Sequence, residues 1–245
     1  MSTARHHRSN RELIDQRSLA LDEPKLQPLQ RAATASVHKR LWFCVYLPNL
    51  PLEAGGPVEQ ARAVVEEQHG IHRVLLADDE AQAAGVMPGQ SANAALALLP
   101  TLALIERSEL AEQQALEHLA GWLEQFTSGV CFAGPGVLLL ELAGSLRFYG
   151  GLASLRQQVA AGLEHQGFVA SLAIAPTPLA ATWLARCGRR VCIREPANLA
   201  AALRTLPNHC LDWPLTVNDS LAGMGIRSVG ECLRLPREGF ARRFG

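Results

Sequence analysis

The sequence predicts an α+β fold whose main part is a ferredoxin-like sheet with the element order βαββαβ. The first observation is a set of four apolar runs with the length of strands, at residues 41–47, 129–132, 137–143 and 168–175. The second is a pair of segments with helical periodicity between them, at residues 108–126 and 152–165. This order packs two helices on one face of a four-stranded antiparallel sheet and leaves the other face free.

The first predicted strand is LWFCVYL, at residues 41–47, which is rich in aromatic and β-branched residues and ends at LPNLP. The forty residues before it are polar and lack a sustained period, so we expect a disordered leader. Residues 51–107 interrupt the order of the sheet and form an insertion. Within it we expect a helix over the Glu-rich residues 57–69, two short helices split by glycines, and strands at residues 74–77 and 102–105.

The helix expected at residues 108–126 has Ser108 as its N-cap. The next two strands are joined by the turn Gly134-Pro135-Gly136, and the second helix and the last strand of the sheet follow. Beyond the sheet the sequence is mainly helical. The expected elements are a helix at 178–187, a short strand at 190–194, and helices at 196–206, 217–223 and 229–235.

Charge is unevenly distributed although the formal net charge is zero. Residues 41–185 carry net −9, whereas residues 186–245 carry ten Arg against five acids, net +5. A basic C-terminal part is typical of a polyanion-binding protein, and an arginine-rich solvated surface is the alternative. The six cysteines contain no CxxC pair, so we expect reduced thiols without zinc or disulfides. Neither a membrane span nor a signal core is present, which favours the cytoplasm.

The run LAGMGIRSVGECLRLP, residues 221–236, has the pattern of a helix-hairpin-helix. Gly225 and Gly230 give the turn its backbone freedom, and a second helix starts near Ser228. Backbone N–H groups at such a helix start bind phosphate without reading bases, and several arginines surround them. An ordinary αα-hairpin with a glycine cap is the alternative. The candidate DNA-binding residues are Gly225, Ile226, Arg227, Ser228, Val229 and Gly230.

Five segments in the right order resemble the Y-family translesion DNA polymerases, and within them the catalytically degenerate ImuB subgroup with its UmuC-like domain. They are LPNLPLEA, EAQAAGVMPGQSANAALALLP, GVLLLELAGSLRFYGG, SLAIAPTPLAATWLA and LAGMGIRSVGECLRLP. The resemblance implies a palm at residues 41–50 and 108–188, a fingers insertion at 51–107 and a helical thumb at 189–245. By the same resemblance the thumb is truncated and the little-finger domain is absent.

Active members of this family hold two magnesium ions with carboxylates on two palm strands. By resemblance these positions fall on Leu47, Gly136 and Val137, and the position of a further family acid falls on Asn49. Every metal-binding carboxylate is therefore replaced. Glu141 lies four residues beyond Val137, which is about 13 Å along a strand. Magnesium ligands lie about 2.1 Å from the ion, so Glu141 cannot take over the role.

The positions that hold the nucleotide in the family are also altered. The shielding aromatic falls on Leu52, the fingers tyrosine and arginine fall on Asp79 and Gln82, and the palm lysines fall on Pro178 and Thr182. An aspartate repels a triphosphate. We therefore expect no catalytic residue, no metal and no cofactor.

The resulting hypothesis is a non-catalytic, polymerase-like subunit that binds DNA in damage-induced (SOS) error-prone translesion synthesis and DNA repair. The resemblance implies DNA, a RecA-like companion, an error-prone replicative-type polymerase and the sliding clamp as partners, without a membrane. Two alternatives stay open. One is an active, divergent Y-family polymerase, and the other is a ferredoxin-like interaction module unrelated to DNA.

Overall fold

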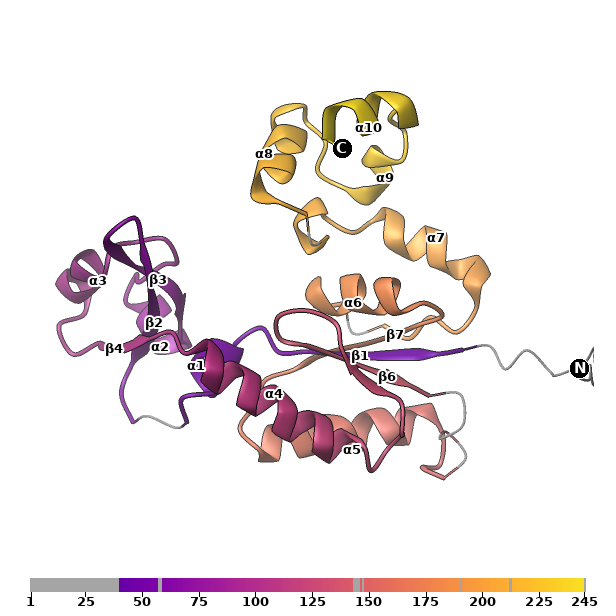
Figure 1. Ribbon diagram of the computed structural model, residues 1–245, viewed down its shortest axis with the longest axis horizontal. Helices are drawn as coiled ribbons and strands as arrows, with labels where there is room; N and C mark the ends of the chain where they lie inside the picture. Colours follow the sequence, from indigo (N-terminus) through magenta and orange to yellow (C-terminus); the bar gives the residue numbers. More distant parts are fainter. Residues whose placement is uncertain are drawn as a thin grey trace, which may run out of the picture. The chain divides into compact units, whose positions relative to one another are not determined.

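The computed structural model describes residues 40–56, 59–142, 146, 148–189, 191–211 and 213–244. Apart from Arg40, the predicted leader lies outside these residues. The described part contains two sheets with helices packed on them (Figure 1), so the prediction of an α+β fold is confirmed. No helix in this described part is long and apolar enough to cross a membrane.

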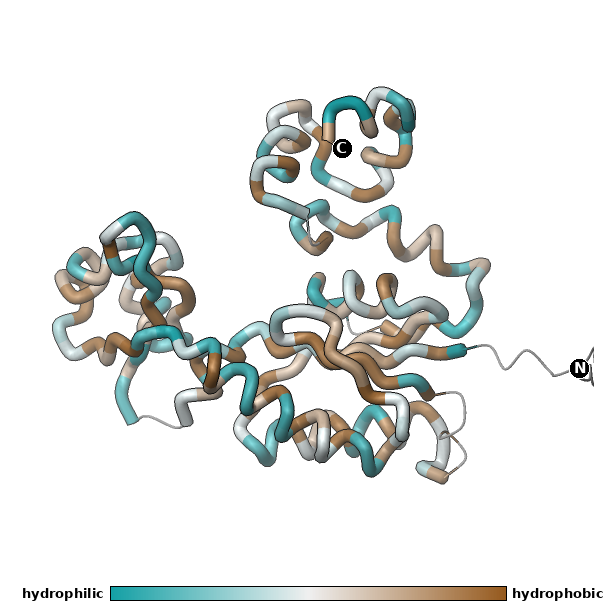
Figure 2. The backbone as a smooth tube through the Cα atoms, viewed as in Figure 1, coloured by the Kyte–Doolittle hydropathy of each residue, from teal (hydrophilic) through white to brown (hydrophobic). Residues whose placement is uncertain are grey.

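The larger sheet has the strand order β5-β6-β1-β7, and all three neighbouring pairs are antiparallel. Its strands are β1 (Trp42–Tyr46), β5 (Val130–Phe132), β6 (Val137–Glu141) and β7 (Ser171–Ala175). They form because each is a short, mainly apolar run, and β6 has four consecutive buried residues. Figure 2 shows this concentration of apolar residues in the sheet.

Helices α4 (Glu109–Leu123) and α5 (Leu152–His165) cover one face of this sheet. Alternate residues of β1, among them Phe43 and Val45, pack there against Leu119 and Leu163. Ser108 caps α4 as predicted, since its hydroxyl accepts a hydrogen bond from the N–H of Ala111 at 3.2 Å.

The opposite face of the sheet is covered as well, so the expectation of a free face was wrong. Helix α6 (Pro178–Arg186) packs there through Ala181 and Leu184 against Cys44, Leu139 and Ala173. The small side chains of α6 let it lie close to the strands. Residues of the C-terminal helical part, Leu206 among them, extend the same apolar cluster.

The insertion forms a second sheet of order β3-β2-β4 with two short helices. Its elements are β2 (Arg62–Gln68), β3 (Ile71–Ala77), α2 (Asp79–Ala83), α3 (Ala92–Leu98) and β4 (Ala103–Glu106), preceded by α1 (Leu50–Glu53). The predicted helix over residues 57–69 was wrong, because β2 occupies most of that stretch. Val64 and Val65 are buried between β3 and β4, and the glutamates lie at the solvent end of the strand.

The C-terminal part consists of short helices. They are α7 (Pro196–Arg204), the 3₁₀ turn η1 (Asn208–Cys210), α8 (Leu215–Gly223), α9 (Val229–Cys232) and α10 (Arg237–Phe244). The strand predicted at residues 190–194 is reduced to a single bridge between Cys192 and Ile174. A disulfide joins Cys187 to Cys210, so the expectation of six reduced cysteines was wrong for this pair.

Arg107 connects the insertion to helix α4. Its guanidinium donates two hydrogen bonds to Glu112, at 2.8 and 3.1 Å, and one to Glu66 of β2 at 2.8 Å. The hydrogen bonds to Glu112, and to a smaller extent the one to Glu66, raise the pKa of Arg107. The planar fork of arginine is needed because both carboxylates are engaged at once.

We expect the substitution Arg107→Lys to lower the free energy of unfolding by about 1–2 kcal/mol, because an ammonium cannot reproduce the bidentate contact. Arg73→Lys is the matched control, since the exposed Arg73 donates one hydrogen bond to the carbonyl of Gly89. It should change stability by less than about 0.5 kcal/mol. Urea unfolding of both variants checks this, and equal losses would contradict it.

A degenerate polymerase-like site

The structure brings Leu47, Gly136 and Val137 together. Strands β1 and β6 pair so that Tyr46 faces Val137, and the N–H of Leu47 donates a hydrogen bond to the carbonyl of Gly136 at 2.8 Å. Leu47 is 2% exposed and Val137 is fully buried. The positions that resemble metal-binding carboxylates therefore meet at one end of the sheet, but they contribute apolar packing there.

The backbone at Gly136 has no room for a side chain. Its φ is 65°, which disfavours residues with a Cβ, and a Cβ built there would lie 2.9 Å from the carbonyl oxygen of Leu47. An aspartate at this position would force the two strand ends apart. The local backbone at position 136 therefore fits the glycine that stands there and does not fit a carboxylate residue.

Glu141 lies at the opposite end of β6, where it pairs in register with Trp42. Its carboxylate is 3.8 Å from the Nε atom of Arg40. The strand thus separates Glu141 from the Leu47–Gly136 contact. Among the described residues, no three His, Cys, Asp or Glu side chains gather closely enough to hold a metal ion.

The positions that resemble nucleotide contacts also lie together. Leu52, Asp79 and Gln82 line a polar pocket of about 130 Å³ between α1 and the insertion. Ligand pockets typically measure roughly 300–1,000 Å³, so this one is small for a nucleotide. The amide of Gln82 donates a hydrogen bond to the carbonyl of Ala77 at 2.6 Å and is therefore engaged within the protein.

Sequence reasoning did not bring together Glu53 and Arg62, two further charged residues that line this pocket. Burial raises the pKa of Glu53, while a hydrogen bond from the N–H of Val169, at 3.0 Å, and the charge of Arg62 oppose that shift. Arg62 is held by its backbone N–H, which donates to Asp78 at 2.9 Å, and by a contact of its guanidinium with the carbonyl of Gly56. No sequence motif links these residues, because α1 and β2 meet only in the folded chain.

Three acids, Glu53, Asp78 and Asp79, line this pocket against one arginine. An acidic lining repels a triphosphate. The two palm-lysine positions agree with this, since the hydroxyl of Thr182 donates to the carbonyl of Pro178 within α6 and neither residue carries a charge.

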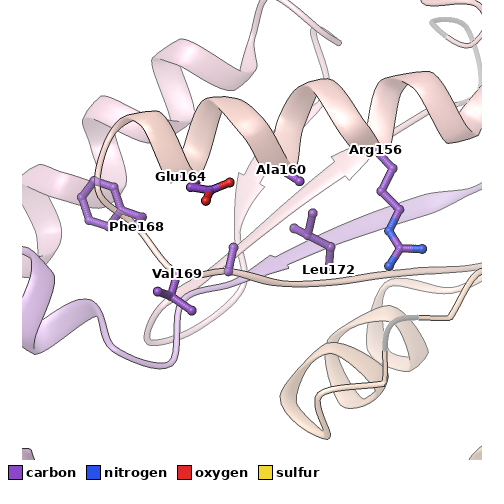
Figure 3. A pocket seen from close by; sticks show the side chains of 7 residues that line it. Arg156, Ala160, Glu164, Phe168, Val169 and Leu172 are labelled. Carbon is purple, nitrogen blue, oxygen red and sulfur yellow. The ribbon is translucent and has the colours of Figure 1, made fainter. Parts of the chain in front are cut away.

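A larger pocket, of about 360 Å³, lies between α5 and the segment that leads into β7 (Figure 3). Arg156 and Glu164 project from α5, with Val169 and Leu172 on the strand side. None of the positions that resemble metal or nucleotide ligands lines it. This pocket therefore shares no lining residue with the pocket beside α1.

The candidate DNA-binding residues occupy the turn between α8 and α9. Gly225 has a φ of 77°, as the predicted turn requires, and Ser228 caps α9 in a capping box with Glu231. The Glu231 carboxylate accepts hydrogen bonds from the N–H groups of Arg227, at 2.7 Å, and Ser228, at 3.0 Å, and these bonds lower its pKa.

The N–H of Val229 donates to the carbonyl of Leu206 at 2.9 Å. Gly225 and Ile226 also donate their N–H groups, to the carbonyls of Ala222 and Leu221. The backbone donors of residues 225–229 thus already have acceptors within the protein. The nearby guanidinium groups are available at the surface, because Arg227, Arg234 and Arg237 are exposed.

Comparison with known structures defines the class of protein. The chain is similar to DinB from Sulfolobus solfataricus, with a TM-score of 0.62 and 14% identity over 82% of this chain and 62% of that one. It is also similar to Dbh DNA polymerase in an insertion ternary complex, with a TM-score of 0.66 and 14% identity over 84% of this chain and 63% of that one. The fold is therefore that of Y-family polymerases.

The impB/mucB/samB family model matches residues 56–186, and the chain belongs to this family. It is 37% identical over 161 residues to Protein ImuB of Caulobacter vibrioides strain NA1000 / CB15N, and equally to that of strain ATCC 19089 / CIP 103742 / CB 15. The match covers 66% of this chain and 35% of each relative. The chain thus spans about a third of the length of these relatives, and the resemblance seen in the sequence is confirmed.

We expect Gly136→Ala to destabilise the protein more than Gly70→Ala. Both glycines have positive φ, 65° and 77°, but only the added methyl group at position 136 meets another atom within 4 Å. The left-handed conformation alone costs about 1–2 kcal/mol, and overpacking adds about 1–3 kcal/mol at Gly136. Urea unfolding measures the difference. Equal losses would show that the contact with Leu47 yields freely.

Proposed function

We propose that this chain is a non-catalytic, polymerase-like subunit that binds DNA and helps to assemble an error-prone translesion synthesis complex. The observation that carries the proposal is the contact between Leu47 and Gly136, where apolar packing and a closed backbone replace the metal-binding carboxylates. Without two metal ions, nucleotidyl transfer lacks its main source of charge stabilisation. The chain keeps the framework of a polymerase while its own residues supply no nucleophile activation.

The domain division belongs to the same proposal. The strand order β5-β6-β1-β7 with α4 and α5 on one face is the arrangement of a ferredoxin-like palm. Residues 41–50 and 108–188 form this palm, residues 51–107 form the fingers, and residues 189–245 form the thumb. The turn between α8 and α9 is the helix-hairpin-helix of the thumb.

DNA is the expected partner of the thumb. The capping box occupies backbone donors at residues 227 and 228, so the affinity for phosphate comes mainly from guanidinium groups. Gly225, Ile226 and Gly230 shape the turn that presents them. The identity with ImuB supports a role within a complex, and we include a RecA-like companion, an error-prone replicative-type polymerase and the sliding clamp as proposed partners.

An active, divergent polymerase is the second candidate, and its specific support is the group of acids Glu53, Asp78 and Asp79 beside α1. The carboxylate of Asp78 is already engaged, because it accepts hydrogen bonds from the N–H groups of Arg62 and Ala81. The pocket volume of about 130 Å³ also disfavours a bound nucleotide. The non-catalytic function is therefore the better supported one.

A primer-extension assay separates these candidates. We expect the purified chain to add no nucleotide to a primer–template with either Mg²⁺ or Mn²⁺, because no three His, Cys, Asp or Glu side chains gather to hold a metal ion within the described residues. An active DNA polymerase added to a parallel reaction shows that the substrate is competent. Metal-dependent extension that is lost in the Glu53→Gln and Asp79→Asn variants would overturn the proposal. Extension that both variants retain would identify a contaminating polymerase.

Fluorescence anisotropy with labelled duplex DNA tests the binding function. We expect affinity to fall steeply with salt and to differ little between sequences, since guanidinium–phosphate contacts release counterions. Arg227→Gln should weaken binding roughly three- to tenfold, at about 1 kcal/mol for one phosphate contact. Arg40→Gln, which removes an exposed arginine at the start of β1, is the matched control and should leave affinity unchanged. Equal effects of the two substitutions would show that the hairpin is not part of the DNA-binding surface.

A further inference from the structure

Residues 206–210 form a scaffold under the hairpin turn. The N–H of Asn208 donates to the carbonyl of Arg227 at 3.0 Å, and its side-chain amide donates to the carbonyl of Ile226 at 2.9 Å. The carbonyl of Leu206 accepts the N–H of Val229 at 2.9 Å. Asn208 is 5% exposed, so these hydrogen bonds are shielded from water. The turn between α8 and α9 is thus held by residues 206–208 as well as by Glu231.

Residues 204–210 fit closely against the start of α9. A Cβ built at Gly230 would lie 2.8 Å from the carbonyl oxygen of Arg204, so the end of α7 touches the start of α9. The thiol of Cys232 also donates to the Asn208 side-chain oxygen at 3.4 Å. A shift of residues 204–210 would therefore move the turn with it.

The disulfide anchors this scaffold to the sheet. Cys210 ends the scaffold, and Cys187 follows helix α6, which packs on the larger sheet. Their Cα atoms are 5.3 Å apart, within the usual range for a disulfide. The bridge links Cys187, which directly follows α6, to Cys210, which lies two residues after Asn208.

Noncovalent contacts also hold the chain between the two cysteines: Ile193 and Leu206 are buried in the cluster with α6, and Cys192 forms a β-bridge with Ile174. The two cysteines are 23 residues apart in sequence, and α7, the helix between them, has no buried residue. Breaking the bridge leaves the closure of this loop to the buried Ile193 and Leu206 and to partly buried side chains such as Leu199 and Leu203. The bridge therefore adds a covalent constraint on the scaffold to these noncovalent contacts.

We propose that the Cys187–Cys210 disulfide is a redox-controlled tether that fixes the α8–α9 turn relative to α6. The oxidant is a low-molecular-weight disulfide such as oxidised glutathione. The thiolate of the half-buried Cys187 attacks one of its sulfurs and releases a glutathione thiolate, and the Cys210 thiolate then displaces the second. Two protein thiols lose two electrons and two protons, and one small disulfide becomes two small thiols. An excess of reduced thiol reverses both steps.

Hydrogen–deuterium exchange on the same chain in its two redox states tests the tether without relying on DNA. After reduction we expect the amides of Asn208 and Val229 to exchange roughly tenfold faster or more, while those of β1 keep their protection. The Cys187→Ser/Cys210→Ser variant should match the reduced chain, and Cys131→Ser, which removes an exposed free cysteine, should match the oxidised one. Reduction of the unmodified chain gives the answer even if the double variant does not fold.

Unchanged exchange on reduction would overturn the tether. So would mass spectrometry showing both cysteines alkylated after treatment with oxidised glutathione, because the bridge then does not form. The consequence for DNA rests on the proposed function of the hairpin. There we expect reduction to weaken binding about three- to tenfold in the unmodified chain and to leave the double variant unchanged. Faster exchange with no DNA binding in either redox state would retain the tether and overturn the proposed function.

Discussion

The antiparallel pairing of β1 with β6 is the interaction on which the rest of the structure depends. Both strands are buried on both faces, so a shift of one residue would move every side chain to the opposite face and disrupt its packing against the helices there. That register places the end of β1 beside the turn that precedes β6 and joins Leu47 to Gly136. In this family the same juxtaposition would bring carboxylates together around metal ions. Here it completes the hydrophobic core instead.

At this end of the sheet, packing disfavours a carboxylate at positions 47 and 136. A lone carboxylate at Leu47, which is 2% exposed, would be buried without a partner, and such a burial costs several kcal/mol. The closed backbone at Gly136 blocks the neighbouring position. A carboxylate is therefore unfavourable at both positions. The acidic lining near Glu53 and Asp79 is also unfavourable for a triphosphate.

In the C-terminal hairpin, one residue both fixes the turn and engages its backbone donors. Glu231 accepts the backbone donors of Arg227 and Ser228, which fixes the turn. It also takes up N–H groups that could otherwise face phosphate. On the proposed function, the attraction of this turn for DNA would come from the exposed guanidinium groups, with weak dependence on base sequence. Hydrogen bonds from Asn208 and the bridge to α6 then hold the turn in its orientation.

The sequence by itself determined the α+β class, the order of elements in the larger sheet, the helix at residues 152–165 and the absence of acids at positions 47, 136 and 137. These follow from local period and residue type. Only the tertiary structure decided that residues 62–68 form a strand, that Glu53 and Arg62 share a pocket, and that Cys187 reaches Cys210. The physical reason is that each depends on contacts between segments distant in sequence, which override local propensity.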